Sequence, residues 1–285
     1  MARRELRRGA AARARAASAA VGLLLWAAAA ATAQEMETPD RDSLMAAGHG
    51  AVGAQPWIGE ELRYKLKYSV FGIGQASLGV PGLDTIGGWA TYAAEMHIEG
   101  SVLGYDIDQK LYSWIDTGRL FSRRFMKDDP GRPREYDFFP EERRVQQIQH
   151  RDSTWSIGTS EPLDDLAFVY LARTLPLEVG QTYEYNQYFK EERNPIILKV
   201  LRRDKLEVGA GAFNTVVVQP IIPESSLFAE GGNAEIHLSD DERRLIVYMK
   251  VDGPILPFNI TLHLEEFQEG VPTGDGGGVE PEAVP

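Results

Sequence analysis

The sequence of 285 residues contains no cysteine. This absence excludes disulfide bonds, thiolate metal sites, cysteine nucleophiles and the cysteine-linked lipid anchor of bacterial lipoproteins. The sequence also lacks a G-x-S-x-G nucleophile elbow, because the glycines around Ser77 have the wrong spacing. Gly72 and Gly74 lack the third glycine and the following helix of a phosphate-binding loop. We therefore expect a protein that is not an enzyme and that binds no cofactor.

Long hydrophobic runs are also scarce. The apolar stretch Ala19–Ala31 is shorter than the roughly 20 residues that a membrane-spanning helix needs, and no second long run follows. Six arginines precede this stretch, and Ala31-Thr32-Ala33 forms a small-x-small site before Gln34. Residues 1–33 therefore have the pattern of a cleavable signal peptide. We expect cleavage near Ala33–Gln34 and a periplasmic or secreted protein without a transmembrane span.

Basic charge is concentrated in residues 1–33, which carry six arginines and one glutamate. The pair Arg3-Arg4 leaves the general secretory route and the twin-arginine route open, as well as a start site assigned too early. Without this segment the formal net charge changes from −12 to about −17. We therefore do not expect affinity for nucleic acid or for anionic lipid surfaces.

The remaining chain divides into three predicted parts. Residues 34–56 have few large apolar residues and predict a flexible lead-in. Residues 268–285 include the glycine run Gly276–Gly278 and predict a disordered acidic tail. Residues 57–267 are expected to form a single β-rich domain, although two β-rich halves hinged at a central helix are the alternative.

A period of two dominates residues 57–267. In Leu62–Val70, apolar residues alternate with polar ones, which is typical of an antiparallel strand with one buried face. Ala90–Ile98 repeats the pattern, and Gly, Pro, Asn and Asp separate further candidate strands. These candidates are Ile73–Val80, Tyr105–Asp116, Leu120–Lys127, Arg134–Phe138, Arg143–His150, Thr182–Lys190, Ile196–Arg203, Phe213–Ile222, Ala234–Leu238, Leu245–Val251 and Asn259–Phe267. The sequence therefore predicts an all-β fold of mainly antiparallel strands.

Leu163–Thr174 is the exception to this pattern. Asp164 is suited to cap a helix, and apolar residues then recur at spacings of three and four until Leu175-Pro176 ends the run. A sheet with this many strands must bury its apolar side somewhere. We therefore expect a curved, partly closed sheet or half-barrel, with one short helix in the middle of the sequence that plugs one end or covers one face.

Several segments share motifs with a known family. Gly59–Tyr64 with Gly72–Ala76 matches a G-E-x-L-x-Y…G-x-A start, and Asp164–Gly180 matches a short helix with an Arg-x-x-Pro-Leu-x-x-Gly exit. Gly211–Thr215 matches a G-x-F-x-T strand start, and Leu238–Arg244 matches an S-D-D-x-R-R turn. These motifs resemble those of bacterial exported proteins called domain of unknown function 3108.

The resemblance extends over almost all of residues 57–267. It singles out Phe213 and Thr215 at the strand start, and His237 stands where the family usually has Trp. The resemblance implies an exported, single-domain protein rich in β-sheet. It implies no catalytic role, because the function of the family is unassigned.

Two acidic pairs are candidates for chemistry. Asp240-Asp241, followed by Arg243, is either a cation or acid–base site or a hairpin turn in which one Asp bonds its own backbone. The pair Asp164-Asp165 is either a metal-binding pair or the N-terminus of a helix. Arg173 can bind an anionic ligand, the last helix carbonyls or a neighbouring carboxylate. We favour the structural role in each case.

Histidines are few, and His97, His237 and His263 lie within predicted strands. A curved sheet can bring strand residues together, but no two histidines have the spacing that places imidazoles on one helix face. We therefore expect no metal site.

Aromatic residues are frequent in the predicted strands. A concave sheet face that is aromatic and aliphatic can hold a lipid-like ligand, because burial of apolar area needs few exact polar partners. We select Tyr64, Tyr68, Tyr92 and Trp114, with Arg173, as candidate ligand-binding residues. An ordinary β core is the alternative interpretation of the same residues.

Our leading functional hypothesis is a non-enzymatic periplasmic binder of an apolar or amphipathic ligand. The alternative is an envelope structural or assembly factor that acts through protein–protein contacts, for instance at a sheet edge. The third class, a glycan or peptide hydrolase, requires carboxylates such as Glu95 and Glu99 to converge with others in a cleft. The expected partners are a lipid-like molecule or an envelope protein.

Overall fold

The fold is described by a computed structural model for residues 55–102, 104–129, 132–150, 153–223, 234–252 and 259–272. The predicted signal peptide, nearly all of the predicted lead-in and the part of the predicted tail beyond Pro272 lie outside these residues. Within the described ranges, no helix has the length and apolar character needed to cross a membrane.

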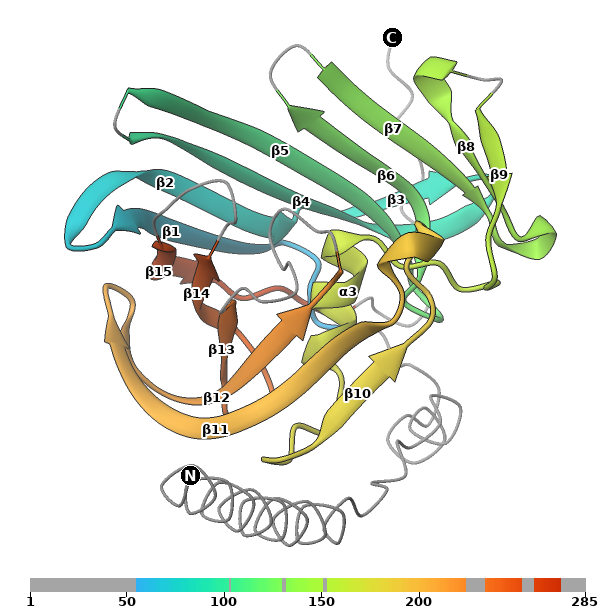
Figure 1. The fold of residues 1–285 in the computed structure, drawn as a ribbon. Coiled ribbons are helices and arrows are strands. Elements are labelled where there is room, and N and C mark those ends of the chain that lie inside the picture. Colours follow the sequence, from blue (N-terminus) through green and yellow to red (C-terminus); the bar gives the residue numbers. More distant parts are fainter. Residues whose placement is uncertain are drawn as a thin grey trace, which may run out of the picture. The chain divides into compact units, whose positions relative to one another are not determined.

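The described residues form a single antiparallel sheet of fifteen strands (Figure 1). Its first nine strands are β1 (Glu60–Tyr68), β2 (Phe71–Val80), β3 (Leu83–Ile86), β4 (Trp89–Val102), β5 (Tyr105–Asp116), β6 (Ser122–Asp129), β7 (Arg132–Phe139), β8 (Arg144–Gln147) and β9 (Thr154–Ser156). The other six are β10 (Thr182–Tyr185), β11 (Ile196–Val208), β12 (Gly211–Ile221), β13 (Glu235–Ser239), β14 (Ile246–Asp252) and β15 (Asn259–Gln268). The α-helix is α3 (Asp165–Arg173), and the 3₁₀ turns are η1 (Pro140–Glu142), η2 (Ile148–His150) and η3 (Glu191–Arg193).

The strand order follows the chain, except where the last strand meets the first. The order is β10-β11-β12-β13-β14-β15-β1-β2-β4-β5-β6-β7-β8-β9, and β3 pairs with β4 beside this path. The β15–β1 ladder joins the two halves of the chain, whereas β9 and β10 are the two edges and do not pair with each other. The predicted all-β, antiparallel fold with a curved and incompletely closed sheet is confirmed.

Most predicted strands are present, and their differences have local causes. Tyr105–Asp116 is predicted and observed with the same bounds. The strand predicted for Thr182–Lys190 ends at Tyr185, because the Asn194 side chain accepts from Tyr188 N at 2.9 Å and donates to Tyr188 O at 3.0 Å, which turns the chain. β3 and β9 are absent from the predicted strands because they have only four and three residues, too few to form a clear alternation.

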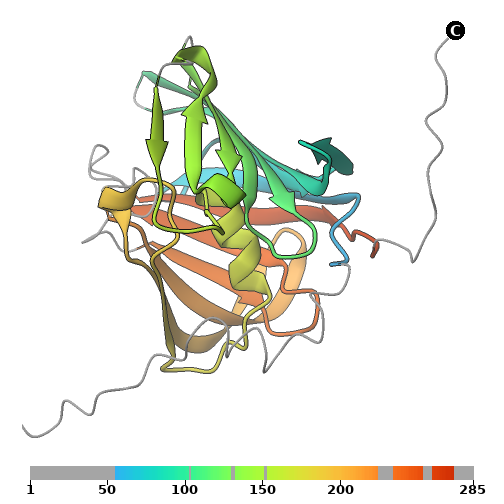
Figure 2. The same ribbon diagram turned by 90° about the vertical axis from the view of Figure 1, so that its right-hand side faces the viewer.

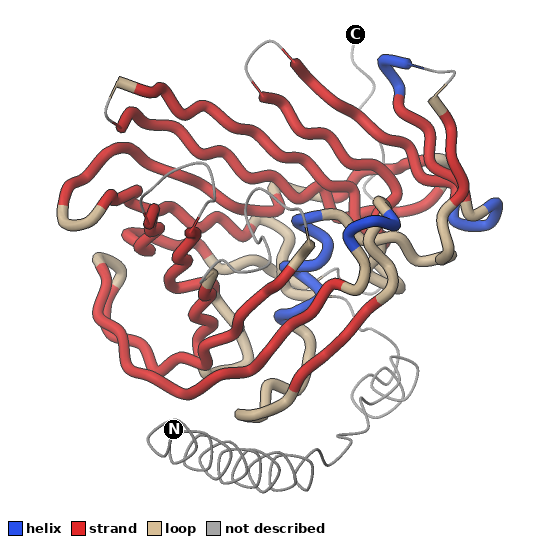
Figure 3. Tube along the Cα trace, in the orientation of Figure 1, coloured by secondary structure: helices blue, strands red, loops and turns tan. Residues whose placement is uncertain are grey.

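The sheet bends around its apolar face. The β1–β15 ladder shifts register between Arg63 and Tyr64, and the β1–β2 ladder shifts between Leu66 and Lys67. Such bulges increase the local twist and bend the strand that carries them. Figures 2 and 3 show the resulting curve, with the strands wrapping around α3. We call the apolar side that faces α3 the concave face, and the opposite side the outer face.

Helix α3 is buried on every side. All nine of its residues are buried, including Asp165 and Arg173 at its ends. The spacing in the sequence predicts an apolar stripe on one side of a helix, but the sheet and the loop residues Trp57 and Tyr188 together bury the whole helix. The helix therefore occupies part of the concave face, and its position limits where a ligand can bind.

The fold also extends past the predicted domain end at Phe267. Gln268 is the last residue of β15, and Val271 pairs with Ile58 through two backbone hydrogen bonds of 2.8 and 3.3 Å. The first residues of the predicted tail thus belong to the sheet margin.

Candidate functional site

The N-terminal end of α3 is fastened to β5 and β6 through Asp164. One carboxylate oxygen of Asp164 accepts from Leu166 N at 2.8 Å and Ala167 N at 3.0 Å, and the other accepts from Ser113 Oγ at 2.6 Å. Asp164 N donates to Ser122 Oγ at 3.0 Å. Burial raises the pKa of Asp164 to about 7, against the opposing effect of these hydrogen bonds. Asp164 is therefore a helix cap with internal partners.

The C-terminal end of α3 is fastened to β1 through Arg173. Its two Nη atoms each donate to one oxygen of Glu60 at 2.6 Å, and Nη2 also donates to Arg243 O at 3.2 Å. The side chains of Arg173 and Glu60 are 1% and 3% exposed. Burial opposes the charge on Arg173, but Glu60 outweighs it, so the pKa of Arg173 is raised. Arg173, a candidate ligand-binding residue, thus binds a carboxylate of its own chain.

Two of the candidate aromatic residues lie in the core beside the helix. Tyr64 is 2% exposed and donates to Ile246 O at 2.9 Å, and Tyr92 is 0% exposed. Trp57 packs against both Tyr92 and Tyr170, with ring centroids 5.4 and 4.8 Å apart. In this structure Tyr64 and Tyr92 therefore have the environment of core residues, which is the alternative interpretation of the aromatic pattern.

The other two candidate aromatic residues lie elsewhere. Trp114 lies on the outer face of β5, where its Nε1 donates to Asp84 Oδ2 at 2.8 Å. Tyr68 is the last residue of β1 and is partly buried. The structure therefore separates the four predicted aromatic residues among the core, the outer face and one end of the concave face.

The helix covers only one end of the concave face. Its anchors Glu60 and Ser113 lie at the same level of the sheet, on β1 and on β5, three strand spacings apart. Three spacings of about 4.8 Å equal the roughly 13 Å length of a nine-residue helix. From the level of these anchors, β5 extends from Ser113 to Ile107, about 20 Å at roughly 3.3 Å per residue. β1 extends in the same direction from Glu60 to Tyr68 and is at least as long.

The far end of the concave face has apolar side chains that are only partly buried. They are Tyr68, Ile73, Ile107 and Ile260, and we call them the mouth residues. The three isoleucines pack against the core, and Ile260 lies directly opposite Tyr68 in the β1–β15 ladder. The mouth residues therefore form an apolar surface that is continuous with the core and still accessible to solvent.

The turn between β1 and β2 extends this apolar surface into solvent. Val70 is 80% exposed and Phe71 is 68% exposed, and Phe71 pairs directly with Tyr68. In Figure 1 this turn lies at the far left end of the β1–β2 hairpin, away from α3. The alternating pattern predicts a strand through Val70, so it does not indicate this exposed turn.

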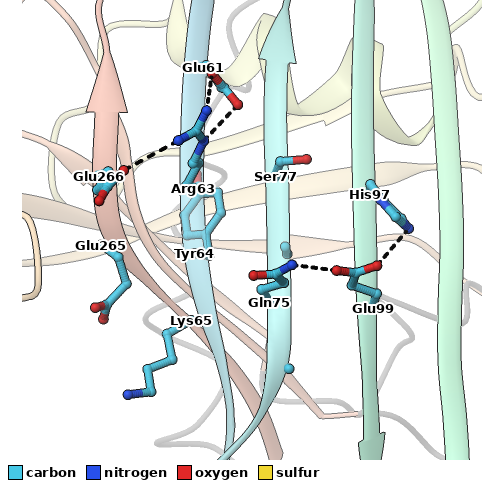
Figure 4. A pocket seen from close by; sticks show the side chains of 12 residues that line it. Glu61, Arg63, Tyr64, Lys65, Gln75, Ser77, His97, Glu99, Glu265 and Glu266 are labelled. Carbon is cyan, nitrogen blue, oxygen red and sulfur yellow. Dashed lines mark hydrogen bonds and ion pairs between the residues drawn. The ribbon is translucent and has the colours of Figure 1, made fainter.

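The outer face carries a groove of about 700 Å³ over β15, β1, β2 and β4 (Figure 4). Charged side chains line it, and several pair with one another, either within one strand or with the neighbouring strand. Arg63 contacts Glu61 at 2.8 Å and Glu266 at 3.5 Å, and Glu99 lies 3.8 Å from His97. An acyl chain in this groove would take charged side chains out of water without giving them a partner, so the groove does not suit a lipid-like ligand.

The acidic pair Asp240-Asp241 lies in the turn between β13 and β14. Asp241 accepts from Ser239 Oγ at 2.7 Å, from Arg243 N at 3.1 Å and from Arg243 Nη2 at 2.6 Å. Asp240 accepts from Arg203 Nε at 2.8 Å. Arginine and backbone donors thus occupy both carboxylates, and Arg243 stabilises the turn.

Phe213 and Thr215 support the same part of the sheet. The Phe213 ring packs edge-on against Phe267, with centroids 6.2 Å apart. Thr215 is fully buried, and its Oγ1 donates to Asp204 O at 3.3 Å and lies 3.3 Å from His237 Nδ1. Both residues therefore contribute packing and hydrogen bonds between strands.

The three strand histidines do not converge. His237 and His263 lie on either side of Tyr248, each with a ring centroid 5.0 Å from that of the tyrosine. His97 belongs to a different cross-strand row and contacts Asp108 at 3.1 Å. Burial lowers the pKa of both His237 and His263. Across the part of the chain that the structure describes, no cluster of three or more metal-ligating His, Asp or Glu side chains is found.

The carboxylates considered for hydrolysis lie in three separate places. Asp164 lies inside the fold at the helix cap, and Asp240 and Asp241 lie in the β13–β14 turn. Glu95 and Glu99 are on β4 and point to the outer face, opposite to the buried Ala94 and Ile98. This distribution gives the hydrolase hypothesis no shared cleft.

These observations define a class of protein: a curved antiparallel sheet that wraps around one buried helix and leaves an apolar mouth at its other end. The chain matches the family model described as "Protein of unknown function (DUF3108)" over residues 63–262. The match covers more than half of the chain, so the protein belongs to this family, and the resemblance inferred from the sequence motifs is confirmed. No curated protein matches the chain.

Several solved structures are similar to this one at low sequence identity. A β-barrel-like protein of domain of unknown function DUF1849 from Brucella abortus has a TM-score of 0.48 and 8% identity, and the alignment covers 76% of this chain and 99% of that chain. A protein with a YmcC-like fold from Bacteroides fragilis, described as exported, has a TM-score of 0.32 and 11% identity over 76% and 99% of the two chains. A protein from Parabacteroides distasonis, described as a lipoprotein, has a TM-score of 0.32 and 10% identity over 77% and 100%.

Proposed function

We propose that this protein is a non-enzymatic binding protein of the bacterial envelope, exported by its N-terminal signal, that takes a lipid-like ligand at the mouth of its curved sheet. The proposal differs from the sequence hypothesis in the residues that carry it. Tyr64, Tyr92 and Arg173 are buried, whereas the mouth residues Tyr68 and Ile107 are only partly buried.

The observation that carries the proposal is the partly buried apolar surface beyond the helix. The three isoleucines of the mouth pack against the core, and all four mouth residues are only partly buried. Monomeric soluble proteins seldom expose large contiguous apolar patches, and such patches often mark binding sites. An acyl chain laid on this surface removes apolar area from water at about 25 cal/mol per Å². The polar end of an amphipathic molecule can then remain in solvent.

The alternative function, a partner protein that adds a strand to a sheet edge, has less support. The two edge strands, β9 and β10, have three and four residues. Short edge strands are one of the devices by which proteins prevent strand addition. Neither edge offers a long unpaired strand to a partner.

Binding of a fluorescent lysophospholipid, kept below its critical micelle concentration, tests the proposal. We expect the mature chain to bind the probe, and the double variant Ile107→Ser/Ile260→Ser to bind it roughly tenfold more weakly or worse, because each substitution removes apolar contact area. Leu83→Ser is the matched control, since Leu83 is 47% exposed on β3 and is not a mouth residue. Equal binding by the double variant, at an unchanged melting temperature, contradicts the proposal.

A further inference from the structure

A second cavity, of about 460 Å³, lies where the start of β4 meets the turn after β5 and η1. Its lining combines apolar groups with polar groups from several elements. The aromatic residues are Trp89 and Phe121, and Arg123 lies between them. This pocket is separate from the mouth, because none of the mouth residues lines it.

Arg123 is held in place from several directions. Its side chain is 6% exposed, and its Nε and Nη2 donate to Asp116 Oδ2 at 3.1 and 3.0 Å. Its Nη1 donates to Glu141 Oε1 at 3.2 Å. The charge of Arg123 is therefore compensated by two carboxylates of the same chain, and its guanidinium plane has a defined orientation.

The guanidinium of Arg123 positions the indole of Trp89. The Cζ atom lies 4.3 Å from the centroid of the Trp89 ring and 4.6 Å from that of Phe121. Stacking on an ordered guanidinium fixes one face of the indole. Trp89 is nevertheless 51% exposed. The result is a fixed aromatic platform with its other side available to a ligand.

The turn beside the platform is also well defined. Asp116 Oδ1 accepts from Gly118 N and from Arg119 N, both at 3.0 Å. The Arg119 side chain is ion-paired with Glu161. Thr117 and Ser160 add hydroxyl groups to the pocket lining. The platform is thus surrounded by polar groups that can donate and accept hydrogen bonds.

The charges of the pocket lining balance. Asp116 and Glu141 are negative, whereas Arg119 and Arg123 are positive. An anionic ligand would meet the two carboxylates, and a cationic ligand would meet the two guanidinium groups. A wholly apolar ligand would contact Trp89 but would make no use of the hydroxyl groups of Thr117 and Ser160. The pocket therefore suits a neutral molecule with one apolar face and a polar edge.

We propose that this pocket binds a neutral saccharide unit, stacked on the open face of Trp89. A pyranose ring presents C–H groups on its face and hydroxyl groups around its edge, and this distribution matches an indole platform inside a polar border. The Glu141 carboxylate and the Thr117 and Ser160 hydroxyls supply the partners for the sugar hydroxyls. Arg123 is a positioning residue, because it acts through Trp89.

The test is saturation-transfer NMR and calorimetry on the mature chain, with neutral tetramers of glucose and of N-acetylglucosamine as probes. At least one probe is expected to bind at millimolar concentration, with transfer strongest at the protons of one ring face. Trp89→Ala is expected to weaken binding at least tenfold, and Trp89→Phe to weaken it less, because a smaller aromatic platform remains. Val179→Ser, a change at another exposed apolar side chain, should bind as the wild type does.

Three results would overturn the inference: neither tetramer binds the wild-type chain, Trp89→Ala binds as tightly as the wild type, or inorganic phosphate displaces the sugar. Lysophospholipid binding separates this site from the mouth. Trp89→Ala should leave that binding unchanged, so either site can fail without the other.

Discussion

The two ends of the concave face differ in how their side chains meet water. At the helix end, Tyr92 and Tyr170 are 0% exposed, and the charged groups Glu60 and Arg173 are paired inside the fold. At the mouth end, Tyr68 and Ile107 are only partly buried, and Phe71 is 68% exposed. The same alternating strands run through both ends, so the difference comes from what packs against them. The helix end is closed by packing and a buried ion pair, whereas the mouth end leaves apolar area accessible, and this is where we propose that a ligand binds.

The largest expected effect is at the helix end. Arg173→Ala leaves Glu60 buried without its partner, and we expect a loss of about 3–5 kcal/mol in the free energy of unfolding. Chemical denaturation measures it. Arg63→Ala on the outer face is the matched control, because Arg63 is 58% exposed, and it should cost at most about 1 kcal/mol. Similar losses for both variants would contradict the contrast between the buried and the exposed ion pair.

A pH-dependent effect should follow at Asp164. Its pKa is raised to about 7 in the folded protein from 3.8, chiefly by burial. The folded state therefore prefers the protonated carboxyl, and the stability that this group contributes is lost as the pH rises from the unfolded towards the folded pKa. Asp164→Asn removes this titration while keeping a residue that can cap the helix.

Relative to the wild type, Asp164→Asn should thus gain about 2–3 kcal/mol between about pH 5 and pH 8, which follows from the two pKa values. Denaturant titrations of both proteins at a series of pH values measure the difference. Profiles that stay parallel across this range would show that the buried carboxyl does not titrate there.

A smaller loss is expected where the sheet turns towards the mouth. A Cβ atom added at Gly74 would lie 2.0 Å from Glu99 O, so the β2 and β4 backbones would have to move apart. We expect Gly74→Ala to cost about 1–3 kcal/mol, as overpacking does. Gly82→Ala is the control, because an added Cβ would have no neighbour within 4 Å. If Gly74→Ala has the same melting temperature as Gly82→Ala, the prediction is wrong.

The smallest effect on stability is expected at the tip of the β1–β2 turn. Val70→Ser/Phe71→Ser changes two side chains that are 80% and 68% exposed, so the free energy of unfolding should change by no more than about 0.5 kcal/mol. Lysophospholipid binding should nevertheless weaken, because Phe71 lies directly opposite the mouth residue Tyr68. A clear loss of stability without a change in binding would mean that the tip belongs to the core.

Much of the fold was predictable from local patterns. The alternation in β1 and the punctuated run Tyr105–Asp116 predict their strands because side chains on a strand have a period of two. Asp164 identifies the start of α3, because a cap acts on amides two and three residues ahead in the same chain. Such signals need no knowledge of distant residues.

The candidate site was harder to predict, because its character depends on distant neighbours. Tyr64 and Tyr68 lie four residues apart on one strand and look alike in sequence. The Tyr64 hydroxyl donates to the Ile246 carbonyl, 182 residues away in the sequence, whereas Tyr68 lies at the open end of the sheet. Arg173 pairs with Glu60, 113 residues away, and no local pattern in the sequence predicts that pairing.

The sequence by itself shows that the chain has no cysteine, and its patterns predicted the antiparallel strands and the helix α3 that the described residues form. These properties rest on composition and on short-range periodicity. Only the tertiary structure decided which apolar residues are core and which remain accessible, because α3 lies across the strands from β1 to β5 and its width of roughly 10–12 Å covers only one end of these longer strands. The position of the helix along the strands separates the buried end from the mouth.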